Sequence, residues 1–220
     1  MPRQPFLPTF SARNYAIGAL ILKDHPEFCA AIGKCIALWT NVDNEMGNLF
    51  SLLLGTQSDA ALELFLCLRR SSNQREALEI AAKFTLSGQE LIVFKALIKV
   101  YKSLEAQRND LAHGCFGVCP DDSSLLFWID VKHHVHFQTE TLLKESNGEF
   151  TEDRHRRLKE NLFVYRHTDL QTLYEDMEQF WWSIFYFNGY IREPSNAGRA
   201  AEFQRVCIFP QVQREIDRLN

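Results

Sequence analysis

The chain has 220 residues and a formal net charge of −4, with 46% hydrophobic and 24% charged residues. This balance excludes a disordered chain, because 17 phenylalanines, 4 tryptophans and 6 tyrosines supply ample apolar surface for a core. The acidic net charge excludes a strongly basic protein that binds nucleic acid without specificity, although it allows a local basic site.

The sequence predicts neither a transmembrane helix nor a signal peptide. No apolar run approaches the ~18 residues that a transmembrane helix needs, so no membrane association is expected. The first ten residues, MPRQPFLPTF, lack the apolar stretch of a signal peptide, which predicts a cytoplasmic protein. In that reducing compartment the six scattered cysteines are expected to be free thiols.

Helical patterns fill the first half of the chain. Asp24 followed by Pro26 predicts a helix start, and apolar residues three or four apart continue the pattern until Gly55. Three more helices are expected, each beginning near a serine that can cap it: residues 59–70, 71–85 and 87–113.

The hydrophobic period changes after residue 114. Residues 125–131 form a compact β-rich run, and residues 134–139 alternate polar and apolar, which predicts a half-buried strand. Residues 116–118 are expected to form a third short strand, and residues 162–165 either a strand or a helix end. The prediction is a small antiparallel β-meander within an insertion at residues 115–166.

A long aromatic helix is predicted from the capping box at Thr168 to Tyr190. Its residues 180–187 are aromatic around most of the helix, so we expect burial nearly all round, partly across a dimer interface. Short helices near residue 200 and after Pro210 complete the chain.

The expected fold is therefore mainly α, a helical bundle with a small antiparallel β-meander after the fourth core helix. No linker rich in Pro, Gly or Ser divides the chain, so residues 1–220 are expected to form one domain. Residues 1–23 are expected to be an extended N-terminal arm or a short helix.

The candidate catalytic residues lie in one short segment at the end of the fourth predicted helix. This segment is Arg108-Asn109-Asp110-Leu111-Ala112-His113-Gly114. Arg108 lies on the apolar stripe, where a buried guanidinium needs a partner. His113 is rotated by roughly 140° from Arg108, so both side chains can flank one groove at the helix end. Asn109 lies one turn before His113 and is placed to orient it.

This segment resembles the signature of the HEPN superfamily (higher eukaryotes and prokaryotes nucleotide-binding), an Arg followed after four to six residues by His. The resemblance implies a helical bundle and metal-independent RNA cleavage without a cofactor. His113 would handle the proton of the ribose 2′-hydroxyl, and Arg108 would neutralise the scissile phosphate. Asn109 and Asp110 would support them.

The resemblance also implies partners. Two motifs usually meet across a symmetric dimer in this superfamily, so a homodimer that acts on RNA is expected. Some members are toxins or phage-defence proteins, which implies an antitoxin or regulatory protein. Many nuclease members place an acid on an earlier helix facing the motif, and Asp43 is the candidate here, whereas Glu45 is interpreted as ordinary solvated polarity.

Two other interpretations of the motif stay open. The protein could be a non-catalytic dimeric module that binds nucleotide, RNA or a protein partner through the same groove. Alternatively, the segment is an ordinary helix end, where Arg108 and His113 complement the helix dipole and Gly114 adopts a left-handed cap.

Two further clusters contain residues that can bind phosphate or a metal ion. Arg154, Arg156 and Arg157 form the densest basic cluster and are candidates for binding RNA phosphates, although neighbouring acidic residues favour a salt-bridged surface helix. The second cluster does not have the spacing of a standard zinc site, so no metal is predicted; it comprises Cys115, Cys119, His133, His134 and His136.

Overall fold

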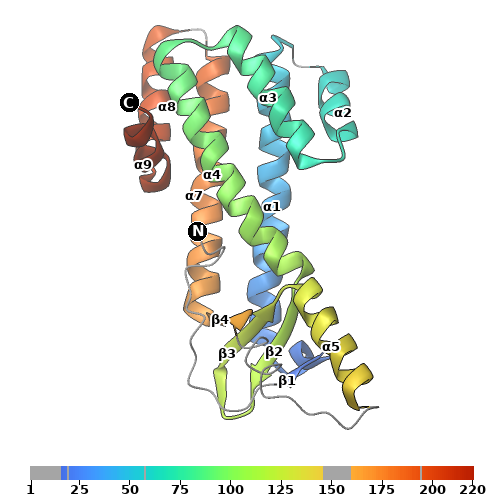
Figure 1. The fold of residues 1–220 in the computed structure, drawn as a ribbon. Coiled ribbons are helices and arrows are strands. Elements are labelled where there is room, and N and C mark those ends of the chain that lie inside the picture. The colour runs from blue at the N-terminus through green and yellow to red at the C-terminus, as the bar shows by residue number, and fades with distance from the viewer. Residues whose placement is uncertain (1–15, 19, 57, 146–159, 194) are drawn as a thin grey trace. The chain divides into compact units, whose positions relative to one another are not determined.

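The computed structural model describes residues 16–18, 20–56, 58–145, 160–193 and 195–220. These residues are mainly helical with a small four-stranded antiparallel sheet, as the sequence predicts (Figure 1). The chain divides into two compact units, each made of two segments. The first unit comprises Met1–Ile36 and Ala106–Tyr174, and the second comprises Ala37–Glu105 and Glu175–Asn220.

The sheet lies in the first unit and runs in the order β1-β2-β3-β4, with every neighbouring pair antiparallel. Its strands are β1 (Ala16–Ile17), β2 (Cys115–Cys119), β3 (Asp122–Ile129) and β4 (Leu162–Arg166). The strands predicted at residues 116–118 and 125–131 are confirmed, although β3 ends at Ile129. Residues 162–165, for which a strand or a helix end was expected, form β4. The N-terminal arm adds β1 at one edge and a 3₁₀ turn, η1 (Ile21–Asp24).

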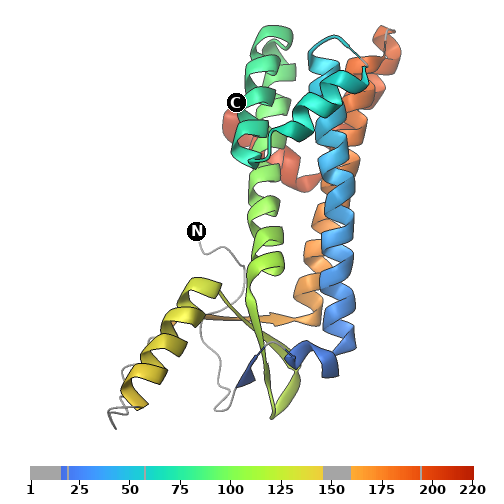
Figure 2. The ribbon, with the colours of Figure 1, turned by 90° about the vertical axis from the view of Figure 1, so that its right-hand side faces the viewer.

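Residues 134–139 are helical, so the strand predicted there is wrong. They lie inside α5 (Val131–Glu145), which follows directly after β3 (Figure 2). Asp130 starts this helix, because its Oδ1 accepts the Lys132 N–H at 2.8 Å and its carbonyl accepts the His134 N–H at 3.0 Å. Phe137 then packs against the sheet core, whereas Val135 is 51% exposed, which a half-buried strand would not allow.

Three long helices contribute residues to both units: α1 (Pro26–Leu53), α4 (Gly88–His113) and α7 (His167–Arg192). The start of α4 agrees with its predicted capping box, because Glu90 accepts the Ser87 N–H at 3.3 Å. The capping box predicted at Thr168 is wrong, because α7 begins at His167 and Asp169 accepts the Arg166 N–H at 2.7 Å.

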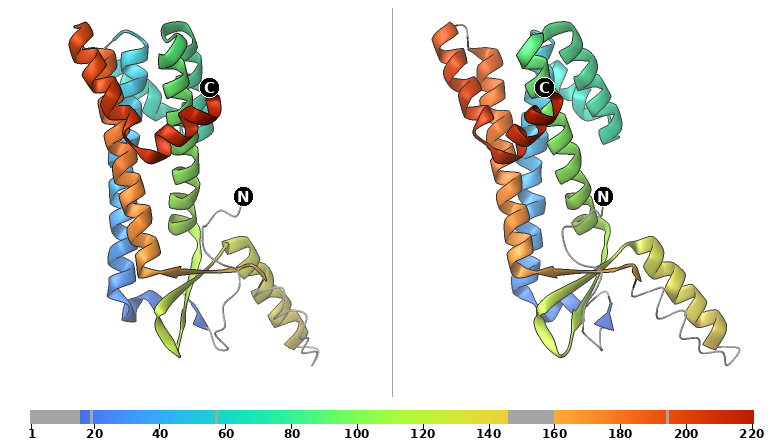
Figure 3. Two further views of the ribbon diagram at one scale, coloured as in Figure 1. Left: turned by 90° about the vertical axis from the view of Figure 1, so that its left-hand side faces the viewer. Right: turned by 60° about the vertical axis from the view of Figure 1, so that its left-hand side comes forward.

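The second unit also contains the shorter helices α2 (Asp59–Cys67), α3 (Ser71–Thr85), α8 (Asn196–Cys207) and α9 (Pro210–Leu219). Its core includes a stack of three buried rings, with Tyr101 5.2 Å from Trp39 and 6.1 Å from Phe180 between ring centroids. The chain turns back after α7, so α8 lies beside its C-terminal part (Figure 3). Across the described ranges, no helix combines the length and apolarity that a membrane crossing requires.

The aromatic part of α7 has two different faces. Phe180 and Phe187 are buried in the core, but Trp182 and Phe185 are 36% and 45% exposed. The prediction that residues 180–187 are buried nearly all round the helix is therefore wrong for the single chain. The exposed aromatic side chains pack on one another instead, with the Trp182 and Tyr186 rings stacked at 5.6 Å.

Candidate functional site

The Arg108–His113 segment forms the last turns of α4, within the first unit. Asp110 is buried with 5% exposure, whereas Arg108 and Asn109 are half-buried and His113 is exposed. The His113 imidazole is therefore accessible to a ligand in solvent, and the Arg108 side chain is partly accessible. The orienting role predicted for Asn109 stays a prediction.

Trp128 anchors the end of α4 to the sheet. Its indole Nε1–H donates to the carbonyl oxygen of Asp110 at 2.7 Å, and the Gly114 N–H donates to the same oxygen at 3.0 Å. Trp128 is itself held in β3, opposite Phe116 in the β2 register and 5.7 Å from the ring of Phe163 in β4. The motif therefore lies on a helix end whose position is fixed by the sheet.

Gly114 leaves room for the Trp128 indole and does not adopt a left-handed cap conformation. Its φ is not positive, unlike those of Gly55 and Gly88, so the predicted cap conformation is wrong. A Cβ on Gly114 would overlap the indole of Trp128. The residue is small because the indole must come close enough to reach the Asp110 carbonyl.

Asp110 and Tyr165 belong to the buried support of the helix end. Burial raises the pKa of the Tyr165 hydroxyl well above its usual range, and the negative charges of Asp110 and Asp169 raise it further. The phenol therefore stays neutral at physiological pH. Asp110 is thus buried, and its backbone carbonyl accepts the hydrogen bond from Trp128. Arg108 and His113 remain the candidate reacting groups.

Cys35 is unsuited to nucleophilic chemistry. Its thiol is fully buried and lies 3.8 Å from the carbonyl oxygen of Leu170. Burial raises the pKa of this thiol to about 11, so the thiolate is scarcely populated near neutral pH. All six cysteines are free, as the sequence predicts.

The acids proposed to face the motif belong to the second unit and have partners there. The Tyr101 hydroxyl donates to Asp43 Oδ1 at 3.2 Å, and burial, followed by the charge of Asp43, raises the Tyr101 pKa. Glu45 accepts the Asn188 Nδ2–H at 2.7 Å and is half-buried, so its interpretation as plain solvated polarity is wrong. The supporting role of Asp43 stays a prediction.

The remaining candidates are the basic cluster and the possible metal ligands. Arg154, Arg156 and Arg157 lie outside the described residues. The described residues contain no group of three His, Cys, Asp or Glu side chains suited to a metal ion. His134 is half-buried on α5, whereas His136 is exposed and its Nδ1 lies 3.6 Å from Glu140.

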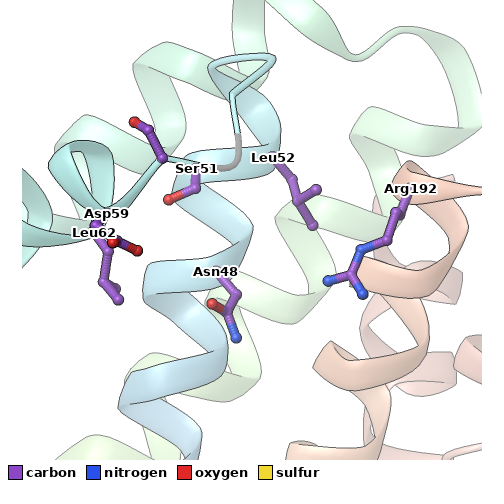
Figure 4. Close-up of a pocket in the computed structure, with 7 residues that line it drawn as sticks. Asn48, Ser51, Leu52, Asp59, Leu62 and Arg192 are labelled. Carbon is purple, nitrogen blue, oxygen red and sulfur yellow. The ribbon is translucent and has the colours of Figure 1, made fainter.

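The structure shows a polar pocket that the sequence analysis did not find. It has a volume of about 230 Å³ and lies in the second unit, between α1, α2 and the end of α7 (Figure 4). Its polar lining residues are Asn48, Ser51, Ser58, Asp59 and Arg192. No pattern in the sequence indicates this pocket, because a serine within a helix and a serine before a helix both have ordinary structural roles.

No family model, curated protein or solved structure matches this chain. The HEPN resemblance accordingly rests on residues 108–114 and their place at the end of a long helix.

Proposed function

We propose that the protein is a metal-independent endoribonuclease of HEPN type, with Arg108 and His113 as its reacting groups. The observation that carries the proposal is the exposed His113 on a helix end that Trp128 fixes to the sheet. Catalytic side chains work best on rigid elements, because their geometry must be held before the substrate arrives. The motif resemblance supplies the reaction class.

The proposed reaction is an attack of the ribose 2′-oxygen on the adjacent phosphorus. His113 accepts the 2′-hydroxyl proton as the new P–O bond forms, and the bond to the 5′-oxygen breaks. Arg108 stabilises the negative charge that develops on the phosphate oxygens, as a permanently charged guanidinium can. The products are a 2′,3′-cyclic phosphate and a free 5′-hydroxyl, and the leaving oxygen takes up a proton.

A second copy of the chain is part of the proposal. In the superfamily that the motif resembles, two motifs converge across a two-fold axis, and this chain carries one. We therefore propose a homodimer with a composite site. A toxin or phage-defence role, with an antitoxin or regulatory partner, follows from the resemblance alone.

The test is RNA cleavage in excess EDTA by the wild type, Arg108→Ala and His113→Ala. Labelled single-stranded and hairpin RNAs serve as substrates, and the products are examined for 2′,3′-cyclic phosphate ends. We expect wild-type cleavage and a loss of at least ~100-fold in each variant, the usual scale for a general base or a transition-state donor. His133→Ala is the matched control, since His133 is an exposed histidine outside the motif.

Two outcomes would contradict the proposal. Equal cleavage by all variants would identify a contaminating nuclease. No cleavage by a folded, dimeric wild type would favour the alternative, a non-catalytic module that binds RNA, nucleotide or a protein through the same residues.

A further inference from the structure

The pocket between α1, α2 and the end of α7 is unusual because its polar groups lack internal partners. Among the described residues, Asn48, Ser51, Ser58, Asp59 and Arg192 make no side-chain hydrogen bond or ion pair, although they line one hollow. Ser51 is buried and Asn48 is half-buried, and polar groups at such positions are normally paired, whereas Ser58, Asp59 and Arg192 are exposed. Asn48, Ser51, Asp59 and Arg192 are seen around the same pocket in Figure 4.

Arg192 is an exposed arginine in the last turn of α7. Arg75, Arg199, Arg205 and Arg218 each pair with a glutamate. Arg192 pairs with none among the described residues, and its guanidinium extends from α7 toward Asn48 (Figure 4). A guanidinium without an internal partner is available for a planar anion, which it can bind through two parallel hydrogen bonds.

Ser51 is the second independent sign of a ligand. It lies within α1 with only 8% exposure, and its hydroxyl lines the pocket without a partner in the described chain. Several helical hydroxyls of this protein bond back to the carbonyl four residues earlier, as Thr85 does at 2.9 Å and Ser183 at 2.8 Å. The Ser51 hydroxyl forgoes that bond and remains available to a bound molecule.

Ser58, at the start of α2, also lacks the hydrogen bond that is usual for its position. It occupies the N-cap position, yet its side chain makes no capping hydrogen bond. Ser195, the N-cap of α8, does accept the Gly198 N–H, at 3.2 Å. The Ser58 hydroxyl lines the pocket next to Asp59, the acidic residue in the first turn of α2.

The walls of the pocket are fixed by packing. A Cβ on Gly47 would collide with Leu62, so the glycine lets α2 lie close against α1. On the other side, Asn188 of α7 donates to both the carbonyl and the carboxylate of Glu45 on α1, at 3.0 and 2.7 Å. A preformed pocket of this kind loses little conformational entropy when it binds a small molecule.

We infer that this pocket binds a small hydroxylated anion, with a phosphate or carboxylate at Arg192 and hydroxyl groups toward Asp59. Arg192 and Asp59 lie on opposite sides of the pocket, so the ligand carries its anionic group and its donors at opposite ends (Figure 4). Hydroxyl groups suit the lining between them, because the two serines and Asn48 can both donate and accept. A pocket with a volume of about 230 Å³ can accommodate a molecule such as a pentose phosphate or a sugar acid.

The test is calorimetric titration with ribose 5-phosphate and with gluconate, which distinguish a phosphate from a carboxylate as the anionic group. Ribose and inorganic phosphate are the partial probes. We expect one of the two hydroxylated anions to bind at least tenfold more tightly than either partial probe. Arg192→Gln should weaken that binding at least tenfold, and Arg205→Gln, whose guanidinium pairs with Glu202 at 2.9 Å, should leave it unchanged.

Ser51→Ala separates a binding role from a structural one. The hydroxyl has no internal partner, so its removal should leave the melting temperature unchanged or higher while it weakens the binding of the probe. The inference is overturned if neither hydroxylated anion binds, if the partial probes bind as tightly, or if Arg192→Gln binds like the wild type. These readouts do not involve RNA, so they are independent of the proposed nuclease activity.

Discussion

Substitution of Gly114 tests the contact by which Trp128 holds the end of α4 against the sheet. Gly114→Ala would push a Cβ into the Trp128 indole, and such overpacking destabilises a core by about 1–3 kcal/mol. Urea denaturation of the variant should show this loss of unfolding free energy. Gly33→Ala is the matched control, because a Cβ there meets nothing within 4 Å and alanine favours the helix, so stability should be unchanged or higher.

Trp128→Phe tests the hydrogen bond of the same anchor. The variant keeps an aromatic ring but loses the indole donor to the Asp110 carbonyl, which contributes about 1 kcal/mol to stability. If the anchor also holds the motif, the RNA-cleaving activity should fall by more than the folded fraction explains. Activity that only follows the folded fraction would separate the anchor from the function.

His134 in α5 makes the stability of the protein depend on pH. Its side chain is half-buried, its Nδ1 has no hydrogen-bond partner in the described chain, and burial lowers its pKa. The folded state therefore binds this proton less readily than the unfolded chain. The resulting stability is present above the ordinary pKa of about 6.5 and is lost as the pH falls below it.

We expect the melting temperature to fall between pH 7.5 and 5.5 and the fall to be smaller in His134→Gln. His133→Gln replaces an exposed histidine of the same helix and should keep the wild-type profile. An unchanged pH profile in His134→Gln would show that other groups control the response.

At the scale of elements, one ion pair holds α3 against α4. Arg75 pairs with Glu105, and the Glu105 carboxylate is nearly buried. Arg75→Leu would leave that carboxylate unpaired and should destabilise the protein by about 3 kcal/mol. The double variant Arg75→Leu, Glu105→Leu should recover most of the loss, because it removes the buried charge as well.

The exposed pair Arg205–Glu202 is the comparison for this prediction. Arg205→Leu should change the unfolding free energy by less than ~1 kcal/mol, since surface ion pairs contribute little. A double variant at residues 75 and 105 that is no more stable than Arg75→Leu would show that the loss comes from packing.

At the scale of the whole molecule, the proposed composite site needs two chains. Sedimentation equilibrium at micromolar concentrations should give twice the mass of one chain. Trp182 and Phe185 expose aromatic surface on α7 and are suited to an interface, where aromatic residues are enriched. A monomer at these concentrations would contradict the composite site and leave a single Arg108–His113 motif to act alone.

The sequence by itself determined the local elements of this protein. Pro26 and the serines near residues 71 and 87 begin helices as predicted, because capping and hydrophobic period depend on neighbours within about one turn. The strands predicted at residues 116–118 and 125–131 followed from the same local signals. The motif residues Arg108 and His113 could also be selected from sequence, and the structure places them on one helix end.

Only the tertiary structure decided the features that join distant segments. The alternation at residues 134–139 suits a strand or a helix, and the Asp130 start together with Phe137 packing on the sheet selects the helix. Gly114 looks like a cap until Trp128, 14 residues later, occupies the space beside it. The pocket at Ser51 and Arg192 joins residues far apart in the chain, and no local pattern records such a contact, because it depends on how helices pack.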